Sequence, residues 1–132
     1  MRVTAALVVD EIRMQEESGT VDLLGLREDL YFDSVPVVLQ SLSLFVELEI
    51  APEDHGRKHV LELRLIDEDG RIAHTTPIRF DIPQGYPKPV AHLDPTLFEV
   101  TFHRFGPHYL DLIANGALDR RVYVNVHRRD AA

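Results

Sequence analysis

Apolar and polar residues alternate along most of the chain, and the clearest alternation covers residues 41–50. Glu47 and Glu49 occupy one phase of this run. The other phase holds five apolar residues, namely Leu42, Leu44, Val46, Leu48 and Ile50. Successive side chains of a strand point to opposite faces, so the pattern predicts a strand with one buried face. A shift of one residue would bury both glutamates, and we therefore expect a firmly fixed register.

A second alternating region predicts a hairpin over residues 57–82. Leu61, Leu63 and Leu65 share one face of a strand over residues 59–66, and the chain returns as an extended run that ends at Ile82. Between the two runs, residues 67–70 end in Asp-Gly. This dipeptide favours a tight turn because glycine accepts the positive φ that such a turn requires.

The N-terminal part of the chain predicts another pair of strands. Apolar residues alternate over residues 3–9, and residues 21–26 return as a second strand after a polar turn over residues 15–19. A helix over residues 10–17 is the alternative, but Ile12 and Met14 would give so short a helix too small an apolar face. Residues 33–36 then interrupt the pattern, because Pro36 cannot donate to a central ladder.

The C-terminal part predicts three more strands. Residues 97–102 form an extended run in which we expect Phe98, Val100 and Phe102 to share one face. Residues 109–114 and 121–126 flank Asn115-Gly116, and this arrangement predicts a terminal hairpin.

About eight strands and no convincing amphipathic helix follow from these patterns. They predict an all-β fold, a single domain over residues 1–132 built as an immunoglobulin-like β-sandwich of two antiparallel sheets. Residues 83–89 are rich in proline and glycine, and we expect them to cross between the sheets. Tyr109 follows a Gly-Pro turn and opens the penultimate strand, where a tyrosine corner is expected.

Composition and charge limit the classes of protein to which the chain can belong. Hydrophobic residues make up 45% and charged residues 27% of the 132 residues, which is typical of a globular domain. The net charge of −8 argues against a nucleic-acid partner, and we expect Arg120, Arg121, Arg128 and Arg129 to be the solvated flank of a last strand.

The chain has no cysteine for disulfides or thiolate metal sites. The apolar run before Asp10 is too short for a secretory signal, and no run suits a membrane span, so the cytoplasm is the expected compartment.

Three segments carry a resemblance to a known family. They are residues 21–25, residues 63–71 and the closing hairpin over residues 106–116. In these segments the chain resembles an uncharacterised bacterial family of small β-sandwich proteins, a domain of unknown function. The resemblance implies the fold over nearly the whole chain, and it implies no activity and no site residues.

The sequence offers few candidate residues for metal binding or catalysis. Asp67 and Asp69 begin like a calcium-binding loop, but no closing glutamate follows, so a solvated hairpin turn is expected. The weak metal-ligand candidates are His103, His108 and His127, which could converge from C-terminal strands on a zinc ion. The serines do not lie in a nucleophile elbow and there is no cysteine nucleophile. We therefore expect no enzyme, and no cofactor is implied.

Four aromatic residues stand on the polar phase of their strands or beside acidic residues. They are Tyr31, Phe32, Phe45 and Tyr123. If they meet, they form an exposed apolar patch suited to a protein partner or a homodimer interface; the alternative is that a loop or the first hairpin covers them. The leading hypothesis is a non-enzymatic module that acts through protein–protein contacts. A metal- or small-ligand-binding sandwich that uses the C-terminal histidines is the alternative, and an enzyme with a site built from end loops is the third.

Overall fold

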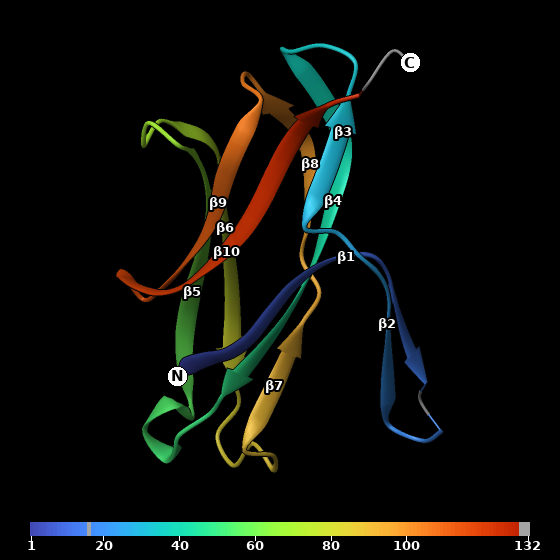
Figure 1. The fold of residues 1–132 in the computed structure, drawn as a ribbon. Helices are drawn as coiled ribbons and strands as arrows, with labels where there is room; N and C mark the ends of the chain where they lie inside the picture. Colours follow the sequence, from blue (N-terminus) through green and yellow to red (C-terminus); the bar gives the residue numbers. More distant parts are fainter. Residues whose placement is uncertain (16, 130–132) are drawn as a thin grey trace.

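Two β-sheets pack face to face in the computed structural model, which describes residues 1–15 and 17–129 (Figure 1). The first sheet contains β1 (Arg2–Gln15), β2 (Thr20–Leu26), β4 (Val37–Glu49), β7 (Val90–Leu93) and β8 (Thr96–Phe102). The second sheet contains β3 (Asp29–Phe32), β5 (Arg57–Asp67), β6 (Ile72–Ile82), β9 (Gly106–Ala114) and β10 (Ala117–Arg128). The predicted all-β sandwich is confirmed, with ten strands among the described residues instead of about eight. The four-residue strands β3 and β7 are too short to show an alternating pattern.

The strand order follows from the pairing. In the first sheet the order is β2-β1-β4, and β7 and β8 pair one after the other with the far edge of β4. In the second sheet the order is β3-β10-β9-β5-β6. All these pairs are antiparallel except β3 with β10, which is parallel. The prediction of purely antiparallel sheets is therefore wrong at this one pair.

The core lies between the sheets and uses the residues that the alternation selects. The five apolar residues of the longest run, Leu42, Leu44, Val46, Leu48 and Ile50, are all buried. Leu61, Leu63 and Leu65 face them from β5 and are fully buried. The register of both strands is therefore the one that the sequence predicts.

The hairpin of β5 and β6 also forms as predicted. One oxygen of the Asp67 carboxylate accepts hydrogen bonds from the backbone N–H groups of Asp69 and Arg71, each at 2.9 Å. Gly70 has φ +81°, the left-handed conformation that a side chain disfavours. The carboxylate thus holds the turn together. Further on, residues 83–89 cross from β6 in the second sheet to β7 in the first, as expected.

The prediction for β8 is wrong at Phe98. Its side chain is 66% exposed, whereas Leu97 and Val100 are buried. The backbone of Glu99 has φ +53°, which is uncommon for a residue with a side chain. This left-handed residue interrupts the alternation, so Phe98 points outward instead of sharing a face with Val100 and Phe102.

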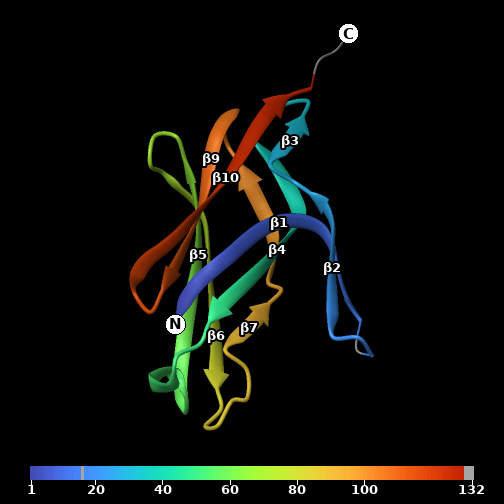
Figure 2. The same ribbon diagram turned by 60° about the horizontal axis from the view of Figure 1, so that its bottom comes forward.

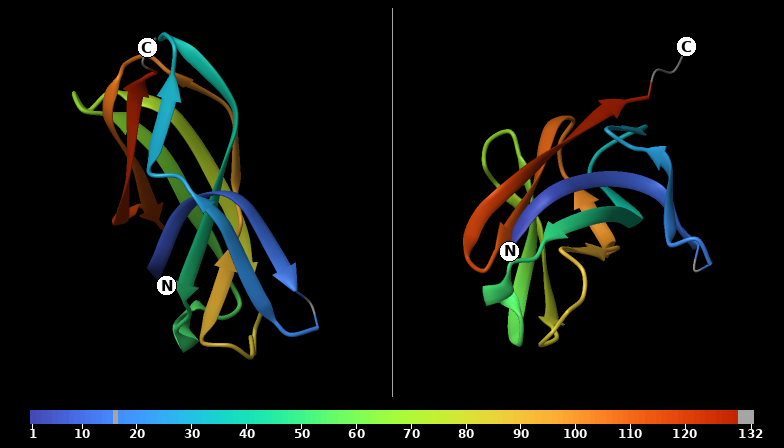
Figure 3. Two further views of the ribbon diagram at one scale, coloured as in Figure 1. Left: turned by 45° about the vertical axis from the view of Figure 1, so that its right-hand side comes forward. Right: turned by 90° about the horizontal axis from the view of Figure 1, so that it is seen from below.

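β1 connects the two sheets along one side of the molecule. Its first half pairs with β4 and contacts β10 of the second sheet, and its second half pairs with β2. Figures 2 and 3 show β1 (blue) arching away from β10 (red) toward the hairpin with β2. This divergence opens the space described below. Over the described residues, no helix is both long and apolar enough to cross a membrane.

Candidate protein-binding face and edge cleft

Tyr31 and Tyr123 lie on the same outer face of the second sheet. Tyr31 of β3 pairs with His127 of β10, and Tyr123 stands four residues before His127 on the same side of that strand. The Tyr31 ring stacks on His127 at 4.9 Å between centroids, and the Tyr123 ring meets Tyr109 edge-on at 6.0 Å. Tyr31 is 54% exposed and Tyr123 is 45% exposed. We call Tyr31, Tyr109, Tyr123 and His127 the tyrosine face.

Paired charges hold the tyrosine face in place. The Arg121 guanidinium lies 4.8 Å from the centre of the Tyr109 ring and donates two hydrogen bonds to Asp111, at 2.7 and 3.0 Å. Asp111 is buried, and its hydrogen bonds and negative charge raise the pKa of Arg121. At the other end of the face, His127 Nε2 lies 2.7 Å from a carboxylate oxygen of Asp29.

The contact with Arg121 also replaces the tyrosine corner expected at Tyr109. The Tyr109 ring lies on the outer face of the sheet, so it is part of the tyrosine face instead of a corner. A hydroxyl-to-backbone bond of the corner type is made by Tyr86, in the crossover between the sheets. It donates to the carbonyl of Val90 at 3.0 Å.

The other two interface candidates do not join this face, and the prediction of a four-residue patch is wrong for them. Phe32 follows Tyr31 and points inward, where its ring packs at 5.7 Å against Phe102 of the core. Phe45 is on the outer face of the first sheet, but it is only 8% exposed. Its ring packs at 5.1 Å against His92 of β7. In both cases a residue from a distant strand covers the ring.

The three C-terminal histidines have different surroundings. His108 is buried, its Nδ1 lies 3.0 Å from the carbonyl oxygen of Gly106, and its ring meets Phe102 edge-on. His127 belongs to the outer tyrosine face, and His103 is exposed between β8 and β9. Within residues 1–15 and 17–129, no group of three histidine, aspartate or glutamate side chains is placed to hold a metal ion. The structure does not bring these histidines together.

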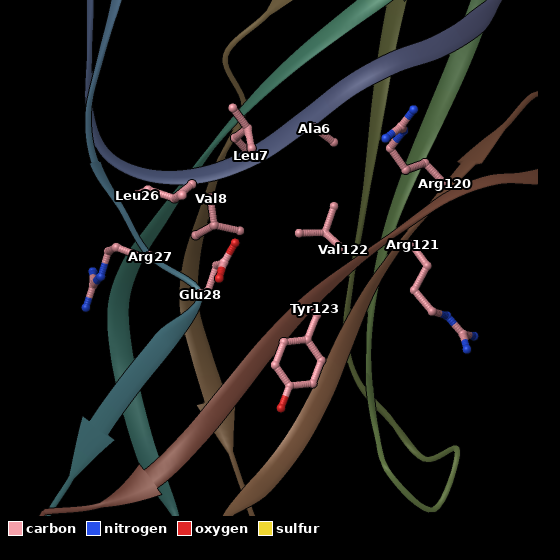
Figure 4. A pocket seen from close by; sticks show the side chains of 10 residues that line it. All are labelled: Ala6, Leu7, Val8, Leu26, Arg27, Glu28, Arg120, Arg121, Val122 and Tyr123. Atoms are coloured by element: carbon pink, nitrogen blue, oxygen red, sulfur yellow. The ribbon is translucent and has the colours of Figure 1, made fainter.

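A cleft opens beside the tyrosine face, where β1 diverges from β10 (Figure 4). Its volume is about 260 Å³, and the link between β2 and β3 forms its third wall. Val8 of β1 and Val122 of β10 line it from opposite sides, and Tyr123 and Glu28 also belong to its lining. The Arg121 side chain points away from it. We call this space the edge cleft.

Hydrogen bonds close both ends of the edge cleft. At one end the Asp119 carboxylate accepts from the backbone N–H of Val3 at 2.5 Å, and Arg120 donates to the carbonyl of Thr4 at 3.3 Å. At the other end the Arg27 N–H donates to the carbonyl of Val8 at 2.8 Å. The first end is therefore set by hydrogen bonds between β1 and β10, and the other by a hydrogen bond between β1 and the link from β2 to β3.

Gly25 allows the third wall to form. Its backbone has φ +71°, and a Cβ atom at this position would lie 2.3 Å from a carboxylate oxygen of Asp10. That carboxylate makes an ion pair with Arg27 at 3.2 Å. Only a glycine lets β2 approach Asp10 so closely and lead the chain into the wall of the cleft.

A model of one protein family matches residues 4–127 of the chain. The chain belongs to DUF6941, a family of unknown function. The sequence therefore correctly indicated an uncharacterised family, and the match covers every residue of the tyrosine face and the edge cleft. No curated protein matches the chain.

Solved structures of a β-glucosidase from Listeria innocua resemble part of the fold. The complexes with isofagomine and with glucose each give a TM-score of 0.47 at 13% sequence identity. The similarity covers 76% of this chain and 15% of the glucosidase chain. A similarity of this extent carries no information about activity.

Sequence reasoning missed the edge cleft and the part that Arg121 has in the tyrosine face. Arg120 and Arg121 stood out only as the flank of a last strand, and that expectation fits their exposure. The sequence gives little indication that Arg121 pairs with Asp111, because the two residues are ten positions apart on different strands. Val8 and Val122 look like ordinary core residues in the sequence.

Proposed function

We propose that this chain is a non-enzymatic module that binds protein through the tyrosine face, either a different protein or a second copy of itself. The observation that carries the proposal is the pair of exposed rings, Tyr31 and Tyr123, each packed against a second ring on one outer face. Tyrosine and arginine are the residue types that most often dominate binding energy at interfaces.

The ordering of these rings supports the proposal. A side chain that is already fixed in the free protein loses less conformational entropy when a partner binds. Stacking on His127 fixes Tyr31, and the contact with Tyr109 fixes Tyr123. Around them the charges are paired with one another, as in Arg121 with Asp111. These groups position the rings, and this arrangement favours binding over acid–base chemistry.

We also propose the cytoplasm as the compartment. The chain contains no cysteine, so it needs no oxidising environment for its stability.

The test compares partners of the wild-type protein with those of the Tyr31→Ala/Tyr123→Ala double variant. Light scattering after size exclusion measures self-association, and quantitative mass spectrometry of captured proteins measures other partners. Phe98→Ala is the matched control, since it removes an exposed ring from the other sheet. We expect that the double variant loses a second copy or a specific protein that the wild type and the control retain. Identical association in all three proteins would contradict the proposal.

A further inference from the structure

In the part of the chain that the structure describes, the outer edge of β10 is unpaired over residues 121–124. β3 pairs with β10 from Asn125 onward, and β1 approaches it at Asp119 and Arg120. Between these points, no strand of the described residues pairs with this edge. Four residues of a strand span about 13 Å. The edge cleft lies directly along this stretch (Figure 4).

The open edge presents unused backbone groups. The N–H of Asn125 donates to the carbonyl of Glu28 at 2.8 Å, so the backbone of Asn125 faces β3. Backbone groups of alternate residues in a strand point to the same side. The N–H and C=O groups of Arg121 and Tyr123 therefore point to the open edge, whereas those of Val122 point toward β9.

The side chains at this edge define what would fit beside it. Val122, partly buried, is the apolar residue of β10 that lines the cleft, with the buried Val8 behind it, and Arg120 stands two positions before Val122 on the same phase of β10. Arg120 donates a hydrogen bond to the carbonyl oxygen of Thr4. Since this acceptor is neutral, the bond does not neutralise the positive charge of the guanidinium. A segment lying along β10 would thus meet an apolar surface and, two positions away, a cation.

We propose that a short extended segment of a partner protein pairs with β10 through the backbones of Arg121 and Tyr123. The segment places one apolar side chain against the partly buried Val122, and one acidic side chain two positions away at Arg120. Addition of a strand to a sheet edge is a common mode of peptide recognition, in which main-chain bonds give affinity and side-chain pockets give specificity. This inference rests on the proposed function, because it adds a binding mode next to the tyrosine face.

The length of the open edge determines the kind of segment. A second copy that paired its own β10 here would bring a strand of 12 residues to a gap of four. That strand would collide with β3 at Asn125, since β3 occupies the same side of β10. A four-residue gap between β1 and β3 instead suits a chain end or an exposed loop, and the proposal assigns it to another protein.

The first experiment is a titration of the ¹⁵N-labelled protein with the peptide acetyl-Thr-Val-Thr-Glu-Thr-amide, followed by NMR. We expect the amide signals of Arg121 and Tyr123 to shift and saturate, and those of β6, at the opposite edge, to stay unchanged.

Replacing the glutamate of the peptide by lysine should weaken binding about two- to fivefold, the usual effect of one exposed ion pair. In the Arg120→Glu variant this preference should reverse, and in the control Arg79→Glu it should persist. No saturable shift up to about 5 mM peptide would overturn the inference.

Two variants separate strand pairing from contact with the tyrosine ring. Tyr123→Ala removes the ring and keeps the N–H, whereas Tyr123→Pro removes both, so the peptide should bind the first variant and not the second. Two peptides N-methylated at alternate residues give the same information on the wild-type protein. One should bind and the other should not, and equal binding of both would overturn the inference. If strand pairing fails while the Tyr31→Ala/Tyr123→Ala variant still loses its partner, the proposed function stands without this inference.

Discussion

Phe45 on the outer face of the first sheet differs in exposure from the two tyrosines on the outer face of the second sheet. On the first sheet, Phe45 is buried under His92 of β7. On the second sheet, Tyr31 and Tyr123 remain about half exposed, although each touches another ring. In the sequence all three occupy similar positions on strands. For these three residues, the neighbouring strand decides whether an aromatic ring on the polar phase is buried or stays exposed.

The charges around the rings differ as well. Beside Phe45, the carboxylate of Glu47 accepts hydrogen bonds from Thr4 and pairs with His92, so the cover of the ring depends on an ionisable contact. On the second sheet, the Arg121 guanidinium donates two hydrogen bonds to the buried Asp111 carboxylate.

The largest expected effect on stability is that of Phe45→Ala. This substitution removes a buried ring and should lower the free energy of unfolding by about 3 kcal/mol. Urea denaturation monitored by circular dichroism measures the change. Tyr31→Ala is the matched comparison on the exposed face. If both variants lost the same stability, the difference between the two faces would disappear.

Arg121→Ala should lower the stability of the fold clearly, but less than Phe45→Ala does. The substitution leaves the buried Asp111 carboxylate without its guanidinium partner and uncovers the Tyr109 ring. We expect a lower urea midpoint, and we expect Arg121→Ala/Asp111→Asn to recover part of it because the unpaired charge is gone. A double variant less stable than the single one would show that the pair does not act as described.

Acid should weaken the first face through Glu47. Hydrogen bonds from His92 and Thr4 lower the pKa of Glu47 below its ordinary value of 4.5, although burial acts against them. A carboxyl group with a lowered pKa in the folded state stabilises the protein above its unfolded pKa, and this contribution disappears as the pH falls through the folded pKa. The wild type should therefore exceed Glu47→Gln in melting temperature at about pH 7, and the gap should narrow as the pH falls below the ordinary value of 4.5 and through the lowered pKa of Glu47. A gap that stays constant with pH would contradict this cause.

The smallest effect on stability should come from the tyrosine face itself. Tyr31→Ala and Tyr123→Ala remove half-exposed rings, and each should change the free energy of unfolding by less than about 1 kcal/mol. The same urea experiment measures them beside Phe45→Ala. A loss as large as that of Phe45→Ala would mean that these rings serve the fold, and the proposal of a binding face would then lose its basis.

The sandwich could be predicted because its strands follow a period of two. Leu42 to Ile50 and Leu61 to Leu65 are buried as the alternation requires, and Asp-Gly marks the turn between β5 and β6. The period fails at Phe98, where one left-handed residue, Glu99, reverses the direction of the side chain. Nothing in the residue types around Phe98 indicates this conformation.

The candidate site was only half predictable. The sequence selects Tyr31 and Tyr123 as aromatic residues on a polar phase, but it selects Phe32 and Phe45 by the same criterion. The residues that cover Phe32 and Phe45 come from β8 and β7, far along the chain. The edge cleft depends on how β1 leaves β10, which is a property of the strand order. Local patterns do not contain that information.

The most direct test of the tyrosine face is site-specific photo-crosslinking in cells that express the protein. A benzophenone amino acid replaces Tyr31, Tyr123 or Phe98 in turn, so that exposed positions on the two sheets are compared in otherwise identical proteins. We expect crosslinks to a protein, or to a second copy of the chain, from positions 31 and 123 and none from position 98. Crosslinks from position 98 alone would contradict the account and would move the binding surface to the first sheet.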